Sequence, residues 1–313
     1  PRFPRCRGRN MKVLLSGSSG LIGSALAAAL ASEGPTVVRL VREKRSAASA
    51  LAPTEQSLQW DPSTGVLAAI ELEGMDAVVH LASENIASGR WTRARKERIR
   101  TSRVDGTGLL SRTLAQLARP PGVLVCASAI GYYGSRGEEV LTEESAPGNG
   151  FLADLVQEWE AASAPARDSG IRTASLRFGV VLSPRGGALA KMLIPFRAGF
   201  GGRIGNGRQY MSWIALDNVV TAVCHVLDNE TLEGPVNVVA PNSLTNGEFA
   251  RALGLALKRP SLLPLPGWAA RLALGEMAED LLLASTRVEP QKLLDSGCRF
   301  EFPELAGALD HLL

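Results

Sequence analysis

The sequence predicts an α/β fold in which a doubly wound parallel sheet carries a smaller, mostly helical C-terminal lobe. Three observations support this prediction. Short apolar runs alternate with helical patterns over the first 180 or so residues, a glycine-rich turn joins the first run to the first helix, and the chain beyond residue 241 is mostly helical. Alternating strands and helices favour a parallel sheet, because each crossover helix returns the chain to the edge where the previous strand began.

The first β-α-β unit is the clearest local prediction. The apolar run Lys12 to Ser16 ends in glycines, and a helical pattern follows over Leu21 to Ala31. Gly34 and Pro35 then stop the helix, and Thr36 to Val41 forms a second apolar run. Such a strand, helix and strand are expected to give a parallel pair.

Further elements follow the same pattern along the chain. Four more strands are expected, at Ala77 to Leu81, Val123 to Ala127, Arg172 to Arg177 and Pro235 to Val239. The clearest later helices are expected at Leu216 to Leu227, Asn246 to Leu257 and Gly267 to Ala284. In this order of elements, the strands of one sheet come first and a mostly helical C-terminal region follows.

The elements suggest two lobes and a short extension. We expect residues 11–182 with 214–241 to form a nucleotide-binding domain, and residues 183–213 with 242–313 to form a substrate lobe. Residues 1–10 contain four arginines and no acidic residue, so the net charge of +3 comes from this segment and the rest of the chain is near neutral. We exclude them from the fold as a leader or non-native extension; a nucleic-acid-binding arm is the weaker alternative.

Composition excludes several classes of protein. The chain is 45% hydrophobic and 21% charged, as in a globular protein, and no apolar run approaches the ~18–20 residues that span a bilayer. Its four cysteines are far apart and form no C-x-x-C pair, so neither a disulfide framework nor a zinc site is indicated. We expect no metal, no nucleic acid, no membrane and a cytoplasmic location.

The glycine-rich turn predicts a dinucleotide site. Its sequence is Gly17-Ser18-Ser19-Gly20-Leu21-Ile22-Gly23, a G-x-x-G-x-x-G between the first strand and the first helix. Residues without a Cβ allow the backbone to pass close to a pyrophosphate, and the helix N-terminus offers free N–H groups to it. We expect Gly17, Ser19, Gly20, Leu21, Ile22 and Gly23 to bind cofactor; the alternative is a glycine turn without a ligand.

The end of the second strand predicts which dinucleotide binds. NAD-binding folds place an acidic residue there to hold the ribose 2′-hydroxyl, but this chain has Arg42. A guanidinium pairs with a 2′-phosphate instead, so we favour NADP over NAD. A solvated arginine is the alternative, and the neighbouring Glu43 is the opposing observation.

These motifs resemble those of the extended short-chain dehydrogenases/reductases, and the chain is similar to their atypical nucleoside-diphosphate-sugar epimerase-like subgroup, whose bacterial members sometimes carry a cell-division-inhibitor label. The resemblance rests on the glycine turn, His80-Leu81-Ala82, Trp60-Asp61-Pro62, Ser83-Glu84-Asn85-Ile86 and Gly275-Glu276-Met277. It implies a Rossmann fold.

The same resemblance implies further cofactor residues. Asp61 is expected at the adenine, Leu81 and Ala82 along a ribose, and Val180 on the nicotinamide side. Arg103 is a further candidate, because Lys96, Arg100 and Arg103 share one helical face that could bind phosphate. For the whole run of residues 93–103, a solvated helix face is the preferred interpretation.

The family's usual proton relay is absent. That relay is a tyrosine with a lysine four residues later, and none of the three tyrosines, Tyr132, Tyr133 and Tyr210, has one. We therefore name Ser128 and Tyr133 as catalytic candidates, although Ser128 could merely end a strand. Glu84 and Asp154 are weaker candidates for proton transfer.

Two functions of different classes follow. The first is an NADP-dependent oxidoreductase or epimerase-like protein that acts on a nucleotide sugar or another small carbonyl or hydroxyl substrate. The alternative is a non-catalytic NADP(H)-binding or redox-sensing protein. The glycine- and arginine-rich loop 201–208 favours the first and suits an anionic substrate, with walls expected from Arg203, Arg208, Gln209 and Trp213. The fold type also suggests a homodimer.

Overall fold

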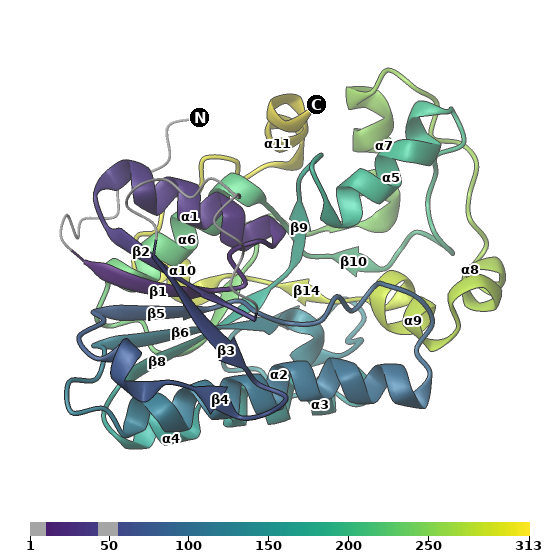
Figure 1. Cartoon of the computed structure of the whole chain (residues 1–313). Helices are drawn as coiled ribbons and strands as arrows, with labels where there is room; N and C mark the ends of the chain where they lie inside the picture. Colours follow the sequence, from purple (N-terminus) through teal and green to yellow (C-terminus); the bar gives the residue numbers. More distant parts are fainter. Residues whose placement is uncertain (1–10, 43–55) are drawn as a thin grey trace, which may run out of the picture.

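An eight-stranded sheet forms the centre of the protein (Figure 1). The computed structural model describes residues 11–42 and 56–313. All strand pairs in the sheet are parallel except β3 with β4. In spatial order the strands are β12 (Gly234–Val238), β8 (Arg172–Phe178), β6 (Val123–Ala129), β5 (Ala77–His80), β1 (Lys12–Ser16), β2 (Thr36–Val41), β3 (Gln56–Asp61) and β4 (Val66–Leu67).

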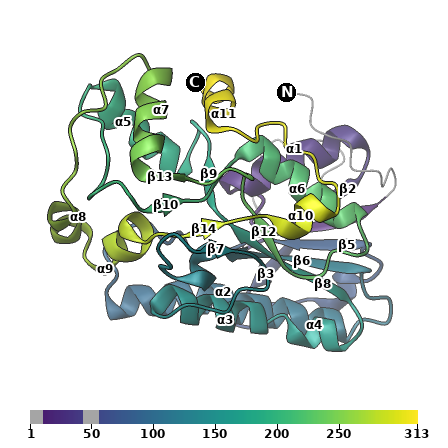
Figure 2. The same ribbon diagram turned by 180° about the vertical axis from the view of Figure 1, so that it is seen from behind.

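Helices cover both faces of this sheet, as Figures 1 and 2 show. One face packs against α1 (Leu21–Glu33), α6 (Leu216–Asp228) and α10 (Gln291–Asp295). The other packs against α2 (Arg93–Ala115), α3 (Phe151–Ala161) and α4 (Ala164–Asp168). Strand β1 is buried on both sides: Val13 and Leu15 join the first apolar core and Leu14 the second. An apolar run such as Val13 to Leu15 in β1 is what a central parallel strand requires.

The remaining elements form a smaller lobe beside the carboxyl ends of the strands (Figures 1 and 2). Its core lies between α5, α7 and α11. The elements of this region are β9 (Val180–Leu182), α5 (Gly187–Arg197), β10 (Tyr210–Met211), β11 (Trp213–Ala215), β13 (Leu244–Thr245), α7 (Asn246–Ala256), α8 (Gly267–Leu274), α9 (Glu276–Ala278), a π-helical turn (Glu279–Leu283), β14 (Arg287–Val288) and α11 (Leu305–Leu312).

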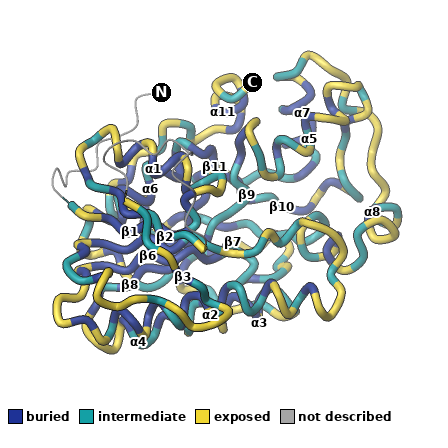
Figure 3. The backbone as a smooth tube through the Cα atoms, viewed as in Figure 1, coloured by how far each residue is buried: buried dark blue, intermediate teal, exposed yellow. Residues whose placement is uncertain are grey.

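Short elements connect the lobe to the sheet. Strand β14 pairs in parallel with β7 (Val140–Leu141), which follows the 3-10 turn Ile130–Tyr133. The other 3-10 turn, Ala69–Leu72, precedes β5. Figure 3 shows burial concentrated in the sheet and in the helix faces that touch it, with exposed backbone over the outer loops and α8.

The structure confirms the fold that the sequence predicts, with local differences. Strands β1 and β2 have the expected bounds, but β3 carries polar residues and is not recognisable from periodicity. The helix expected over 267–284 is interrupted at Gly275, which has a φ of 64°. Cys126 and Cys298 are free and buried. Within residues 11–42 and 56–313, no helix has the length and apolar content to cross a bilayer.

Candidate functional site

The strand order reverses beside β1, and the glycine turn lies at that point. The chain passes from β1 to β2 on one side and later returns to β5 on the other. A Cβ built on Gly17 would lie 2.7 Å from the backbone nitrogen of Ala82, so the two loops touch through their backbones. The Ser16 hydroxyl accepts hydrogen bonds from the amides of Leu81 (3.1 Å) and Ala82 (3.2 Å). Ligands of doubly wound folds bind in the crevice formed at such a point.

The turn leaves the N-terminus of α1 open. Gly17 has a φ of 70°, and a Cβ on Gly23 would lie 2.2 Å from the Gly17 carbonyl oxygen, so both positions require glycine. Gly20 is the N-cap, no side chain caps the helix, and the first turn, which includes Leu21 and Ile22, has no acidic residue. The unpaired amides and the positive end of the helix dipole therefore favour an anion here.

Arg42 and Asp61 lie at the ends of neighbouring strands. Arg42 directly follows β2 and is exposed; the Gln59 side chain donates to its carbonyl oxygen at 3.5 Å. Asp61 ends β3 and accepts hydrogen bonds from the Ser63 hydroxyl (2.6 Å) and the Ser63 amide (2.9 Å). These bonds lower the pKa of Asp61 and keep it ionised. Glu43, the opposing observation of the sequence, lies outside the described residues.

Val180 and the start of α5 lie on the side of the glycine turn away from Arg42 and Asp61. Val180 begins β9, where its amide donates to the Ser212 carbonyl at 2.9 Å, and its side chain is half-buried. A Cβ on Gly187 would lie 3.4 Å from the Leu21 side chain. The smaller lobe therefore contacts the glycine turn directly.

A buried polar network lies at the ends of β6 and β8. The Ser128 hydroxyl donates to Glu160 at 2.6 Å, and Arg177 donates to both Glu160 oxygens at 2.8 Å. Arg177 also donates to the Tyr133 hydroxyl at 2.9 Å, which in turn donates to Asn237 at 2.7 Å. Strand register places Ser128 beside Arg177, and α3 supplies Glu160. The network thus connects one catalytic candidate to the other.

This network changes the chemistry available to Tyr133. Its side chain is fully buried, and burial raises the pKa of Tyr133 to about 12 although Arg177 opposes the shift. Burial alone would lower the pKa of Arg177, but the hydrogen bonds and charge of Glu160 outweigh this and raise it. The guanidinium also lies 3.5 Å from the ring centroid of Tyr132. The Tyr133 hydroxyl thus accepts a hydrogen bond from Arg177 and donates one to Asn237, so both of its hydrogen-bond partners are side chains of this protein.

Glu160 and Arg177 were not recognised in the sequence. The available signal was an arginine near the end of an otherwise buried strand, and a carboxylate on the facing helix. On the same helix the positions Leu155 and Val156 are buried and apolar, and Asp154 is exposed. Glu84 is paired with Arg95. Its carboxylate is therefore already engaged.

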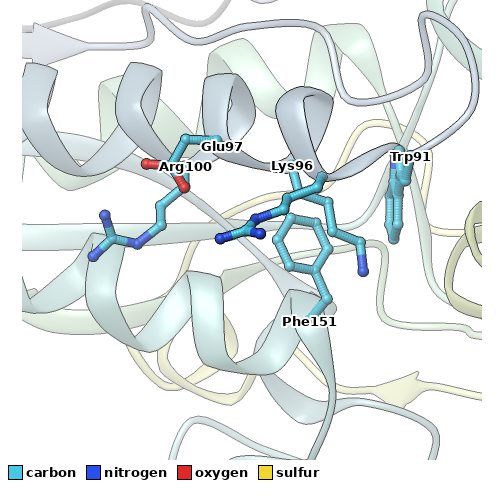
Figure 4. A pocket seen from close by; sticks show the side chains of 6 residues that line it. Trp91, Lys96, Glu97, Arg100 and Phe151 are labelled. Carbon is cyan, nitrogen blue, oxygen red and sulfur yellow. The ribbon is translucent and has the colours of Figure 1, made fainter.

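The basic face of α2 borders a surface cavity of about 370 Å³. Figure 4 shows Lys96 passing over the Phe151 ring toward Trp91, with Arg100 further along the helix. The Lys96 amine lies 4.7 Å from the Phe151 centroid. Lys96 forms an ion pair with Glu276, and Arg100 one with Glu158. Arg103, the third member of the face, is 7% exposed and has no carboxylate partner among the described residues.

The expected substrate walls are only partly accessible. Arg203 and Arg208 are exposed. Gln209 borders a cavity of about 430 Å³, but its amide donates to the carbonyls of Ile204 and Leu282, both at 3.0 Å. Trp213 is fully buried and donates to the Asn242 carbonyl at 3.0 Å, so its expected place in the wall is wrong.

Comparisons with known proteins agree with this geometry. The profile of the NAD dependent epimerase/dehydratase family matches residues 13–239, and that of a domain of unknown function, DUF1731, matches residues 265–312. An epimerase family protein of Mycobacterium bovis is 43% identical over 302 residues, which cover 96% of this chain and 97% of the relative. Human epimerase family protein SDR39U1 is 36% identical over 310 residues, which cover 97% and 100%.

Solved structures show the same relationship. The crystal structure of human SDR39U1 with NADPH has a TM-score of 0.85 and 34% identity, covering 96% of this chain and 99% of that one. A nucleoside-diphosphate sugar epimerase from Corynebacterium glutamicum has a TM-score of 0.79 and 35% identity, covering 97% of this chain and 58% of that one. The chain therefore belongs to the NAD dependent epimerase/dehydratase family, as an atypical, epimerase-like member of the extended short-chain dehydrogenases/reductases.

Proposed function

We propose that this protein binds NADP(H) at the glycine turn and acts as an NADP-dependent oxidoreductase or epimerase-like protein on a small substrate. The observation that carries the proposal is the backbone contact between Gly17 and Ala82, beside an uncapped α1 and the exposed Arg42. The human relative crystallised with NADPH supports the same cofactor.

The residues of the turn fit such a cofactor. Side chains at Gly17 or Gly23 would clash with neighbouring backbone, so only glycine keeps the tight turn that presents the α1 N-terminus to a pyrophosphate. Arg42 is exposed at the end of β2, where its guanidinium would pair with a 2′-phosphate. Bound NADP(H) would supply hydride-transfer chemistry. Leu81, Ala82 and Val180 would then border the rest of the dinucleotide, and Asp61 its adenine.

The substrate side of the proposal rests on Ser128 and the smaller lobe. The Ser128 hydroxyl donates its hydrogen bond to Glu160, so its oxygen is left as a hydrogen-bond acceptor for a substrate hydroxyl. We propose residues 183–213 and 242–313 as the substrate lobe, in which Arg203 and Arg208 are exposed for an anionic substrate. A nucleotide sugar is one such substrate, and the name of the Corynebacterium relative supports that class.

A second function is favoured by one specific observation. The Tyr133 hydroxyl has protein partners on both sides, and no tyrosine of this chain is followed by a lysine at the relay spacing. A non-catalytic NADP(H)-binding or redox-sensing protein needs neither group. In that case the cofactor site would be kept and the network around Arg177 would be structural.

The first experiment is a fluorescence titration of the purified protein with NADPH and NADH. Arg42→Ala is expected to weaken NADPH binding at least tenfold and leave NADH binding unchanged, because only NADPH carries the 2′-phosphate. Arg299→Ala, another exposed arginine, is the matched control. Preferential NADH binding by the wild type would overturn the choice of NADP. Oxidation of bound NADPH by members of a sugar-nucleotide and carbonyl panel would then distinguish an enzyme from a sensor.

The homodimer and the cytoplasmic location remain part of this proposal. The homodimer follows from the family resemblance, and sedimentation at micromolar concentration tests it. The plant relative from Arabidopsis thaliana is named chloroplastic, so location differs among proteins of this family.

A further inference from the structure

Two segments of the smaller lobe carry positive charge without any negative charge. Residues 183–216 and 249–275 contain nine of the chain's 34 lysines and arginines and none of its 31 acidic residues. Within the described residues, Arg271 is the only one of these nine that forms an ion pair, and its partner is Glu279. The other eight cations stay uncompensated, so this lobe presents a positive surface although the net charge of the chain is only +3.

The same lobe exposes large apolar side chains along one edge. Leu262 is 83% exposed, although a leucine gains free energy from leaving water. Six side chains that are each more than half exposed form what we call the lobe-edge patch: Phe200, Leu255, Leu262, Leu263, Trp268 and Leu272. Exposed apolar side chains gathered in one region of a surface indicate a contact site.

Backbone contacts bring part of this patch together with several of the cations. The loop between α7 and α8 runs beside the chain that follows α5: the Leu263 amide donates to the Gly201 carbonyl, and the Arg259 side chain donates to the Arg197 carbonyl, both at 3.3 Å. Phe200 directly precedes Gly201. Figures 1 and 2 show this loop and α8 along the edge of the lobe that lies farthest from the sheet.

The exposure of the patch is a fixed feature of the fold. Pro260, Pro264 and Pro266 restrict the backbone of the loop on both sides of its exposed leucines. Helix α8 continues the edge, where Trp268 and Leu272 are four residues apart and therefore share one helix face. They are 68% and 71% exposed. Figure 3 shows the same loop and helix as exposed.

The combination of charge and apolar exposure indicates what covers the patch. A second copy in a symmetric contact would bring two positive surfaces together, which is unfavourable. Nucleic acid would match the charge, but phosphate contacts do not bury exposed leucines. An anionic bilayer matches both properties, because its headgroups attract lysine and arginine while leucine and tryptophan insert beside them. It also needs no complementary pocket, which suits side chains along an outer edge.

We propose that the lobe-edge patch binds the surface of an anionic lipid bilayer. Leu262, Leu263 and Trp268 insert among the lipids, and Lys258 and Arg259 lie at the headgroups. Such a surface contact needs no spanning helix. The sequence-based expectation of no membrane rests on the missing long apolar run, which concerns spanning segments alone. The inference goes beyond the proposed function and does not depend on the cofactor site.

Flotation of the purified full chain with lipid vesicles tests the apolar part of the proposal. The wild type is expected to float with phosphatidylcholine vesicles that contain about 30% phosphatidylglycerol, and to bind vesicles of phosphatidylcholine alone at least tenfold more weakly. Leu262→Ser combined with Leu263→Ser should weaken binding to the anionic vesicles at least tenfold. Ile70→Ser is the matched control, because Ile70 is 80% exposed but lies in the 3-10 turn before β5.

The charged part of the proposal is tested with the same vesicles. Lys258→Gln combined with Arg259→Gln is expected to weaken binding at least tenfold at low salt, and the difference should shrink as salt is raised. Arg98→Gln combined with Arg299→Gln removes two exposed arginines away from the patch and should leave binding unchanged. All substituted side chains are exposed, so the Tm of each variant should match that of the wild type.

Tryptophan fluorescence tests the insertion directly. Trp268 is the only exposed tryptophan within the described residues. Lipids brominated on their acyl chains are expected to quench the fluorescence of the vesicle-bound wild type. Trp268→Phe, which keeps an apolar ring, should still float with the vesicles but lose this quenching. A bound wild type without quenching would contradict insertion of the patch.

Several results would overturn the proposal. Absence of flotation with anionic vesicles would do so and would favour an acidic protein as the occupant of the patch. Equal binding by the wild type and either double variant of the patch would show that the patch is not the contact. A dimer, measured by sedimentation, that dissociates only in the leucine variant would show that a second copy covers it. If the leucine variant does not fold, the lysine–arginine variant and Trp268→Phe decide. NADPH titration is independent of all these results, so its failure would refute the proposed function alone.

Discussion

Gly23→Ala tests whether close backbone contact holds the glycine turn in shape. A Cβ at this position would lie 2.2 Å from the Gly17 carbonyl oxygen, 2.8 Å from the Gly17 carbonyl carbon and 2.9 Å from the Ser18 Cα. All three atoms belong to the backbone, so no side-chain rotation relieves the clash and α1 must move away from the turn. Overpacking of this kind costs about 1–3 kcal/mol.

The usual effect of such a substitution has the opposite sign. Alanine is favoured over glycine inside a helix by about 1 kcal/mol. Gly307 in α11 provides the matched control, because a Cβ there meets nothing within 4 Å. Gly307→Ala is therefore expected to stabilise the protein, whereas Gly23→Ala should lower its free energy of unfolding by up to about 2 kcal/mol after both terms are included.

Urea unfolding and NADPH fluorescence titration measure the two consequences together. Because the amides of Leu21 and Ile22 move with the helix, Gly23→Ala is expected to weaken NADPH binding at least tenfold, or about 1.4 kcal/mol. Gly307→Ala should leave it unchanged. A Gly23→Ala protein as stable as Gly307→Ala, with NADPH affinity within twofold of the wild type, would refute the reasoning.

Two further predictions concern buried charged or titratable groups. Burial lowers the pKa of His80 to about 4, from 6.5 for a free imidazole, so the folded state resists protonation. The free energy of unfolding should be highest above about pH 6.5 and fall by about 3 kcal/mol as the pH is lowered to 4. In urea unfolding measured at a series of pH values, His80→Asn should show a smaller fall over this range. Glu160→Gln leaves the Arg177 side chain, only 3% exposed, without its counter-ion, which should cost about 3–5 kcal/mol. Adding Arg177→Met to Glu160→Gln should recover much of the lost free energy of unfolding. A double variant no more stable than Glu160→Gln would show that the unpaired Arg177 does not cause the loss.

The sequence predicts the sheet well because its strands are buried on both faces. Val13, Leu14 and Leu15 have no exposed surface, and only continuous apolar runs satisfy that condition. Strand β3 is different: it reads Gln-Ser-Leu-Gln-Trp-Asp and lies near the sheet edge, where polar residues are tolerated. Periodicity therefore does not indicate it. Asp61 is a candidate only through the family resemblance, since nothing local marks the end of such a strand.

The parts of the candidate site that lie in one segment of the chain can be predicted from the sequence. The glycine turn follows from local backbone geometry, and Arg42 from its spacing after that turn. The network of Ser128, Glu160 and Arg177 joins three distant segments, and no spacing rule connects them. Tyr133 looked available because it follows a strand end, but tertiary packing encloses it. Pairing in three dimensions also explains why Lys96 and Arg103, alike in sequence, differ in their counter-ions.

The hydrogen bond of Ser128 limits what a substrate could do at this site. Ser128 already donates its hydrogen bond to Glu160, so its oxygen accepts a hydrogen bond from a substrate hydroxyl more readily than the group donates one to a carbonyl. That arrangement suits binding of the hydroxyl form of a substrate.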